Sequence, residues 1–434
     1  MTRKALDSLL DLPVYEAAGS IVDANAAVIR ADLQTARIGD ICTVRSPDMA
    51  VEIEAEVVGF QNRKAVLIPL GSLQHLPLSS EVISRGGERR IDLSEGLLGR
   101  VVDAAARPID GQGPVAGPAI SVPLHQDPPA AMRRPPVRMM FRTGLRVIDG
   151  LLTCGRGQRM GIFGEAGGGK STLLAALANG CEADVCVIAM IGERGREVRE
   201  FVEDTLGPTG LAKSVLVVST SDRPAIERAE AAFAATRVAE YFRDQGKSVL
   251  LLVDSLTRYA RAQRDLALAA GELPARRGFP VSVFSRLPAL LERAGNSETG
   301  SITAFYTVLV EGDGDNDPLA EEVRSIVDGH IHLSQALAAE RHYPAIDPLT
   351  SKSRLMDKVA TEPHCAAARQ VARHIAKYKE ISFLVQVGEY AEGSDTDADA
   401  ALQLRPAINA FLRQDMHETA DLRAVLNGLE ALVQ

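Results

Sequence analysis

The residues Gly164–Ser171, which read Gly-Glu-Ala-Gly-Gly-Gly-Lys-Ser, fit the pattern G-x-x-x-x-G-K-[ST]. An apolar run that predicts a strand, Arg159–Phe163, ends directly before them, and a helical pattern covers Ser171–Ala178 directly after them. In this strand–loop–helix context the glycines turn backbone N–H groups toward a phosphate, and the helix N-terminus adds a positive dipole. The sequence therefore predicts a phosphate-binding loop, in preference to a merely flexible glycine-rich turn.

The predicted loop gives individual side chains a chemical task. Lys170 is placed to reach the β and γ phosphates of a nucleoside triphosphate, and the Ser171 hydroxyl is placed to ligate magnesium. The residues expected to bind the nucleotide in this stretch are Gly164, Gly167, Gly168, Gly169, Lys170, Ser171 and Thr172.

Two carboxylates follow other apolar runs. Val249–Val253 ends in Asp254, at a point where a second magnesium-orienting group is needed. Glu193 follows the run Val185–Met190, so it stands at the carboxyl end of a strand, where open α/β sheets bind their ligands. Taken alone, an Asp at a strand end is also a common helix cap, and the run Gly192–Glu197 is also typical of a charged surface.

The patterns divide the chain into successive parts. Short β-branched runs from Gly19 to Ser94, with strict alternation in Val51–Val58, predict a small β-barrel. Apolar strands spaced by helices then predict a mainly parallel sheet covered on both faces, and helical spacing beyond Leu355 predicts a helical tail. We expect the barrel at residues 1–95, the α/β core at 96–355 and the helical domain at 356–434.

Composition and charge exclude several classes of protein. The 434 residues are 46% hydrophobic and 24% charged, which fits a globular chain and neither a fibre nor a disordered protein. Lys and Arg number 48 against 57 Asp and Glu, and this net charge of -9 argues against binding nucleic acid through uniform positive charge. Phe60 is the only aromatic residue between Gly19 and Ser94, so the barrel lacks platforms for stacking bases. We expect no nucleic-acid partner.

Targeting signals and cysteines indicate a cytosolic protein. No apolar run approaches the roughly 20 residues that cross a bilayer, and Met1–Leu6 does not lead into the apolar region of a signal peptide. The five cysteines form an odd set without a C-x-x-C pair, which favours free, packed thiols over a metal site or a disulfide framework. They are Cys42, Cys154, Cys181, Cys186 and Cys365.

A third motif supplies a family resemblance. Tyr343–Arg354, Tyr-Pro-Ala-Ile-Asp-Pro-Leu-Thr-Ser-Lys-Ser-Arg, resembles the signature P-[SAP]-[LIV]-[DNH]-x3-S-x-S of rotary ATPase alpha and beta subunits and their secretion relatives. Together with the phosphate loop and Gly192–Glu197, it makes the chain resemble the type III secretion system ATPases, with the flagellar export ATPase as the nearest sibling. The loop continuation Gly167–Leu174 looks more like the injectisome branch than the flagellar one.

The resemblance implies a fold and an active site. It implies a RecA-like P-loop NTPase core with a small N-terminal β-barrel and a C-terminal helical domain, assembled as a homohexamer that binds ATP and Mg²⁺ between neighbouring subunits. By motif match, Glu193 is implied to activate water and Arg354 to act as an arginine finger on the adjacent subunit's ATP. Tyr343 is implied to stack on adenine, with Phe411 completing the pocket. Arg194 and Arg258 resemble arginines near the γ-phosphate, although ion pairing with Glu197 or Asp254 explains them nearly as well.

The resemblance also implies partners. The loop Gly271–Pro280 resembles one that faces a coiled-coil stalk protein in the central channel, and the helical domain is expected to receive chaperone–effector complexes. For the assembled ring, the resemblance implies a regulatory, stator-like protein and an export gate at the inner membrane as further partners. These expectations place the protein in the cytoplasm, peripheral to the inner membrane when assembled.

Alternative functions remain open at the level of sequence. They are a flagellar export ATPase, a rotary synthase beta-type subunit, a non-catalytic nucleotide-binding ring subunit and a RecA-like nucleic-acid translocase. Glu197–Phe201 weighs against the synthase subunit, and Glu193 weighs against the non-catalytic subunit, which lacks an activating carboxylate.

Overall fold

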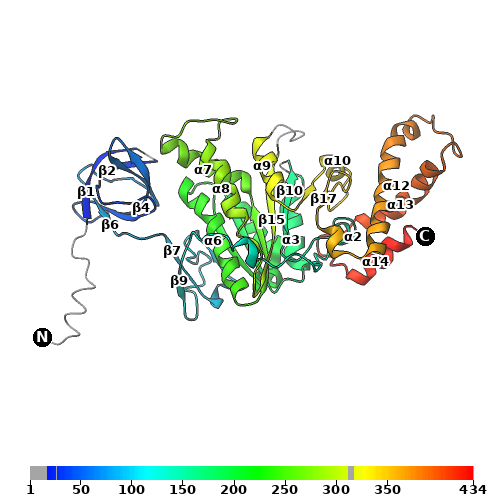
Figure 1. Ribbon diagram of the computed structural model, residues 1–434, viewed down its shortest axis with the longest axis horizontal. Coiled ribbons are helices and arrows are strands. Elements are labelled where there is room, and N and C mark those ends of the chain that lie inside the picture. The colour runs from blue at the N-terminus through cyan, green and yellow to red at the C-terminus, as the bar shows by residue number, and fades with distance from the viewer. Residues whose placement is uncertain (1–16, 26, 166, 311–316, 434) are drawn as a thin grey trace.

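The computed structural model describes residues 17–25, 27–165, 167–310 and 317–433. Its parts follow one another along the long axis, with a β-barrel at one end, an α/β region in the middle and helices at the other end (Figure 1). Met1–Leu6, from which we expected no signal peptide, lies outside the described residues.

The N-terminal strands close into the predicted barrel. Residues such as Ile29, Val44, Val57 and Leu67 are fully buried inside it, because successive side chains of a strand point to opposite faces. The strand order is β1-β2-β5-β4-β3-β6. The strands are β1 (Ala17–Ala24), β2 (Ile29–Asp32), β3 (Ile41–Arg45), β4 (Glu52–Gln61), β5 (Lys64–Pro69) and β6 (Glu81–Ser84).

The middle of the chain forms a mainly parallel sheet, as predicted. Its order is β17-β16-β10-β15-β13-β11-β12-β8, with β14 paired to β15, and only the β14 and β17 pairings are antiparallel. Its strands are β8 (Val101–Val102), β10 (Arg159–Gly164), β11 (Val185–Ile191), β12 (Ser214–Ser219), β13 (Ser248–Asp254), β14 (Gly295–Asn296), β15 (Ser301–Leu309), β16 (Gly329–His332) and β17 (Lys352–Ser353).

Helices cover both faces of this sheet. On β11, Val187 and Ile191 belong to one apolar cluster, whereas Ile188 and Met190 belong to the other. The first face is covered by α6 (Ala225–Asp244), α7 (Leu256–Ala269), α8 (Val281–Leu291) and α9 (Pro318–Ile326). The second face carries α2 (Arg146–Leu151) and α3 (Lys170–Gly180). The C-terminal helices α12 (Glu362–Gln386), α13 (Thr396–Leu412) and α14 (Leu422–Ala431) extend the same apolar cluster by packing on α2 at the end of the molecule (Figure 1).

Short elements complete the described chain. Those of the α/β region are α4 (Gly195–Glu200), the π-helix η3 (Phe201–Leu206), α5 (Gly207–Ala212), α10 (Gln335–Ala339) and α11 (Met356–Val359). Ahead of them lie β7 (Arg90–Leu93), β9 (Ile120–Pro123) and the 3-10 turns η1 (Glu95–Leu97) and η2 (Ala131–Arg133). β7 pairs with β9, and Ile91 and Leu93 are buried in the cluster under α6, so residues just before position 95 already pack on the α/β core. The division of the chain at residues 95 and 355 stays a prediction.

The cysteines are buried and free, as predicted, and no disulfide joins them. Cys181 and Cys186 come closest, with their Sγ atoms 3.8 Å apart. Among the described residues, none of the helices is both long enough and apolar enough to span a bilayer.

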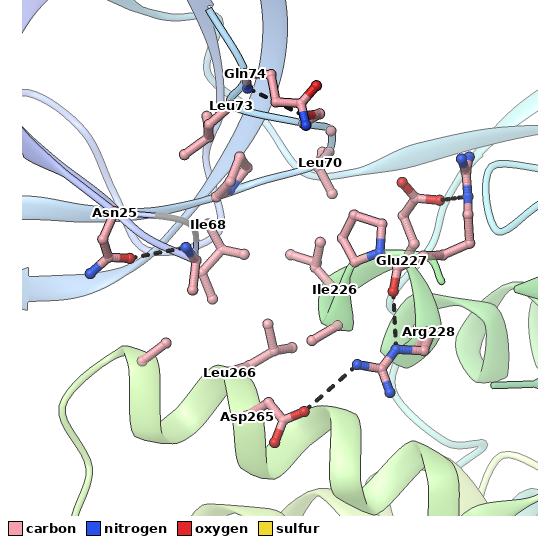
Figure 2. A pocket seen from close by; sticks show the side chains of 18 of the residues that line it. Asn25, Ile68, Leu70, Leu73, Gln74, Ile226, Glu227, Arg228, Asp265 and Leu266 are labelled. Atoms are coloured by element: carbon pink, nitrogen blue, oxygen red, sulfur yellow. Dashed lines mark hydrogen bonds and ion pairs between the residues drawn. The ribbon is translucent and has the colours of Figure 1, made fainter. Parts of the chain in front are cut away.

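A groove of about 970 Å³ separates the barrel from α6 and α7. Figure 2 shows Ile68 and Leu70 of the barrel side facing Ile226 and Leu266 across it, while an ion pair between Arg228 and Asp265 lies at its border. The barrel and the core therefore face each other across a groove that has apolar residues at its centre and an ion pair at its border.

A buried carboxylate lies next to this groove. Glu230 of α6 faces a smaller cavity of about 130 Å³ that is also lined by Glu56 of β4. The Glu230 side chain is buried, both of its oxygens lack a hydrogen-bond partner, and its nearest cation is the Arg89 Nε at 3.7 Å. Burial raises the pKa of Glu230 to about 8, against an opposing effect of Arg89.

We expect Glu230 to make stability depend on pH. Its pKa is raised in the folded state, so the folded chain binds the extra proton, and its stability falls as the pH rises from about 4.5 to about 8. Glu230→Gln removes the ionisable group, so its melting temperature should fall less steeply than that of the wild type between pH 5 and pH 8. Glu321→Gln, at an exposed position of α9 and not among the charges that act on Glu230, is the control and should keep the wild-type slope. Parallel curves for wild type and Glu230→Gln would contradict this role.

Candidate active site

The predicted site residues gather at one edge of the sheet. β10, β13 and β11 run parallel, directly or through β15, and Met190 lies beside Asp254 in the register. The carboxyl ends of these strands therefore bring the phosphate loop, Asp254 and Glu193 to the same side of the molecule. This edge is the candidate active site.

The phosphate loop has the backbone that its glycines predict. Gly167 and Gly169 have φ values of 82° and 83°, in the left-handed region that favours glycine, and Gly169 caps α3. Lys170 is buried, and its ammonium donates to the carbonyl of Gly164 at 2.8 Å and to that of Glu165. Burial lowers the pKa of Lys170, while the charges of Asp254 and Glu193 oppose that shift.

The metal-ligand candidates flank the loop. Ser171 is exposed in the first turn of α3, and Asp254 is buried at the end of β13. The Thr307 hydroxyl donates to the Asp254 Oδ1 at 2.6 Å and fixes the carboxylate, although burial raises its pKa. Sequence reasoning missed Thr307, because a threonine within the apolar strand β15 looks like any β-branched strand residue.

Glu193 is held by an arginine from α7. The Arg258 Nη2 donates to the Glu193 Oε2 at 2.9 Å, and the Arg258 Nε lies 2.8 Å from Oε1. Of the two sequence interpretations of Arg258, a place near the γ-phosphate and an ion pair with Asp254, the second gives way to an ion pair with Glu193. A Cβ added at Gly192 would lie 3.0 Å from the Arg258 Cδ, so the absence of a side chain at Gly192 leaves room for Arg258 to pass. Arg194 pairs with Glu197 at 2.8 Å, as one of the two alternatives predicted.

The environment of Glu193 suits a general base. Burial raises its pKa to about 7, with smaller contributions from Asp254 and Glu197 and an opposing one from Arg258. A carboxylate with a pKa near the working pH is both available to accept a proton and basic enough to take it.

Arg354 lies far from the phosphate loop of its own chain. Its backbone N–H donates to the Asp328 carbonyl at 3.0 Å, and Asp328 in turn bonds to Arg159 at the start of β10. Gly164 ends β10 five residues later, which is about 16 Å along a strand. The exposed Arg354 guanidinium donates to the Arg324 carbonyl at 3.1 Å. Within one chain it is therefore at the opposite end of β10 from the phosphates' predicted position.

Tyr343 lines a small pocket beside the phosphate loop, of about 30 Å³. A Cβ added at Gly169 would lie 3.5 Å from the Tyr343 ring, so the ring lies against the loop. Leu145, Thr172, Gln414, Asp415 and Met416 are among the other lining residues.

Phe411 does not line that pocket. Positions for a Cβ at Gly150 and Gly428 lie 3.2 Å and 3.3 Å from its ring, so the ring packs between α2 and α14. Met416, five residues later and beyond the end of α13, is one of the apolar side chains that line the pocket, and the role of Phe411 in binding adenine stays a prediction.

Comparisons with known proteins agree with this geometry. Residues 144–353 match the nucleotide-binding domain of the ATP synthase alpha/beta family, and residues 360–431 match the T3SS EscN ATPase C-terminal domain. A type 3 secretion system ATPase of Sinorhizobium fredii (strain NBRC 101917 / NGR234) is 51% identical over 95% of this chain and 92% of its own length. The chain belongs to the type 3 secretion system ATPase family.

Solved structures and a flagellar relative extend the match. The assembled ATPase EscN from enteropathogenic E. coli has a TM-score of 0.89 and 45% identity, covering 96% of this chain and all of that one. EscN in complex with its central stalk EscO gives a TM-score of 0.88 at the same identity and coverage. The flagellum-specific ATP synthase of Bacillus subtilis is 43% identical over 99% of this chain and 98% of its own. The predicted family, fold, ATP-hydrolysing activity and role in type III secretion are confirmed.

The Glu193–Arg258 pair predicts the pH profile of this secretion ATPase. If the predicted role of Glu193 as general base is right, it must be ionised to accept a proton, so kcat/KM should rise with pH and level off above about pH 7. Arg258 lowers the Glu193 pKa, so Arg258→Ala should move the rising limb to higher pH, as measured by initial rates from pH 5.5 to 9. Arg264→Ala on the same helix is the control, and an unmoved limb in Arg258→Ala would contradict the pairing.

Proposed function

We propose that this secretion ATPase hydrolyses ATP only at interfaces of a homohexameric ring, where one subunit supplies the phosphate loop and Glu193 and the next supplies Arg354. The observation that supports this most is the position of Arg354 at the opposite end of β10 from its own loop. A cation that stabilises phosphoryl transfer must touch the transferring group, so Arg354 can serve only a neighbouring copy. The assembled form of the relative EscN is consistent with a ring.

Within that interface the residues divide the chemistry. Backbone N–H groups of the loop and Lys170 bind and orient the triphosphate, while the Glu193 carboxylate accepts a proton from the attacking water. Ser171 and Asp254 are the residues that would hold Mg²⁺, since hydroxyl and carboxylate oxygens suit this ion and Asp254 is already fixed by Thr307. Bound Mg²⁺ would supply positive charge to the phosphate oxygens.

The base of ATP is assigned to the pocket beside Gly169. Tyr343 provides an aromatic face next to the loop, and Leu145 and Met416 provide apolar walls. The pocket's empty space is small, so we infer that Tyr343, which is 42% exposed, turns outward to stack on the base.

Two surfaces are proposed for partners of the ring. The loop between α7 and α8 carries Arg276 and Arg277 and faces a coiled-coil stalk, by analogy with the EscN–EscO complex. The C-terminal end of α12 exposes Phe383, Leu384, Val385 and Val387, an apolar tip that we propose receives chaperone–effector complexes.

The roles of the three domains and the location of the ring are proposed from the family resemblance. We propose that the barrel at residues 1–95 contributes to oligomerisation, that the core at 96–355 hydrolyses ATP and that residues 356–434 dock cargo. The ring then acts in the cytoplasm, at the inner face of the inner membrane, with a stator-like regulator and the export gate.

Glu193→Gln tests the catalytic carboxylate. The amide cannot accept the water's proton, so turnover should fall by about 10² to 10⁴ while ATP affinity stays near wild type. Equilibrium binding of a fluorescent ATP analogue and steady-state turnover measure the two effects. Glu200→Gln, at an exposed position of α4, is the control, and a Glu193→Gln enzyme with near-normal turnover would refute the assignment.

Mixed rings test whether Arg354 acts on a neighbour. Arg354→Ala should lower turnover by about 10³-fold or more, without weakening ATP binding by isolated subunits. Mixing it with Glu193→Gln subunits should restore measurable hydrolysis, because some interfaces then combine an intact Glu193 with an intact Arg354. If co-assembly is verified by crosslinking and no activity returns, the arrangement across the interface is wrong.

A further inference from the structure

A single buried glutamine connects the pocket beside the phosphate loop to the C-terminal helices. Gln414 follows α13 closely and is 6% exposed. Its Oε1 accepts from the Arg146 backbone N–H at 2.8 Å, and its Nε2 donates to the carbonyls of Gly144 and Glu418, both at 2.7 Å. Its own backbone N–H donates to the Tyr343 carbonyl at 2.9 Å.

These partners fix the orientation of the amide. A backbone N–H can only donate and a backbone carbonyl can only accept, so the oxygen must face Arg146 and the nitrogen must face Gly144 and Glu418. A glutamate of the same shape could keep the first contact but would set a carboxylate oxygen against two carbonyl oxygens.

The contacts of Gln414 surround the pocket. The groups that its side chain bonds at Gly144 and Arg146 flank Leu145, and its backbone N–H bonds the Tyr343 carbonyl, so both lining residues are held to this one residue. Met416, a third lining residue, lies two positions further along the same segment.

A second tether holds this segment to α2. The Arg146 Nε donates to the Phe411 carbonyl at 2.8 Å, its guanidinium donates to the Arg413 carbonyl, and it forms an ion pair with Glu418. Residues 411–418 are thus fastened at several points to the first residues of α2, so the position of this pocket wall depends on how α13 sits against α2.

We propose that Gln414 is a positioning residue for the nucleotide base: it does not touch the reacting phosphates, and it holds Leu145, Tyr343 and Met416 in the arrangement that receives the base. This role rests on the base site proposed above, and it adds the residue that holds the walls of that site in place. It follows that the C-terminal helical region supplies part of the nucleotide site.

The test compares two ligands that share phosphates but not the base, Mg-ATP and Mg-tripolyphosphate, by titration calorimetry. Gln414→Ala should raise the Kd for ATP by about tenfold, the effect of losing buried hydrogen bonds that order a site, and leave that for tripolyphosphate within about twofold. At saturating ATP its kcat should stay within about threefold of wild type, so the loss appears in KM. Gln403→Ala, an exposed position on α13, is the matched control and should change neither Kd.

Other variants separate the possible failures. Gln414→Glu keeps the shape of the side chain and should weaken ATP binding as much as Gln414→Ala does. It therefore replaces the alanine variant if that variant does not fold. The positioning role would be overturned if Gln414→Ala weakened the binding of ATP and of tripolyphosphate equally, or if it did not weaken the binding of ATP. If Tyr343→Ala also leaves the ATP Kd unchanged, the base site itself is wrong; if Tyr343→Ala weakens ATP and Gln414→Ala does not, only the role of Gln414 is wrong.

Discussion

The structure depends on keeping Lys170, Glu193 and Asp254 together at one partly buried edge of the sheet. Each of these groups loses hydration there, and each is stabilised in its charged form by an opposite charge: Lys170 by the two acids, and Glu193 by Arg258. The parallel sheet makes this possible, because strands β10, β11 and β13 end at the same level and deliver the three residues from separate parts of the sequence. Loss of one charge would leave its partners buried without compensation, so the edge is a cooperative unit.

Much of this edge could be predicted from the sequence, and the reasons are local. The loop Gly164–Ser171 dictates its own backbone through glycines that must adopt left-handed φ values, and an apolar strand followed by an acid fixes Asp254 at a strand end. The barrel, the mainly parallel sheet and the helical tail also follow from local periodicity. For these features, the information lies within a few residues of the feature itself.

The features that sequence reasoning missed depend on contacts between distant segments. Thr307 acquires its role only because β15 lies beside β13, and Arg258 reaches Glu193 only because α7 starts next to Gly192. Phe411 and Met416 are both apolar residues near the end of one helix, and only the packing against Gly150 and Gly428 decides which of them meets the pocket. The roles proposed for Glu193 and Arg354 come from the family resemblance, because periodicity and spacing alone do not specify them.

The same distant contacts connect the nucleotide site to the apolar tip of α12 that is proposed to receive cargo, without involving the residues proposed to act in catalysis. The phosphate loop, Glu193 and Asp254 belong to the sheet and its buried strands, whereas the pocket wall at Gln414–Met416 belongs to the segment that follows α13. α13 packs along α12, whose far end carries the exposed apolar residues around Phe383. A protein that binds this tip and shifts the two helices would act first on the base pocket, because Gln414 and Arg146 are its attachment to α2. By reciprocity, a nucleotide that holds the pocket closed would hold α13 in place and so change the affinity of the tip for its ligand by the same factor.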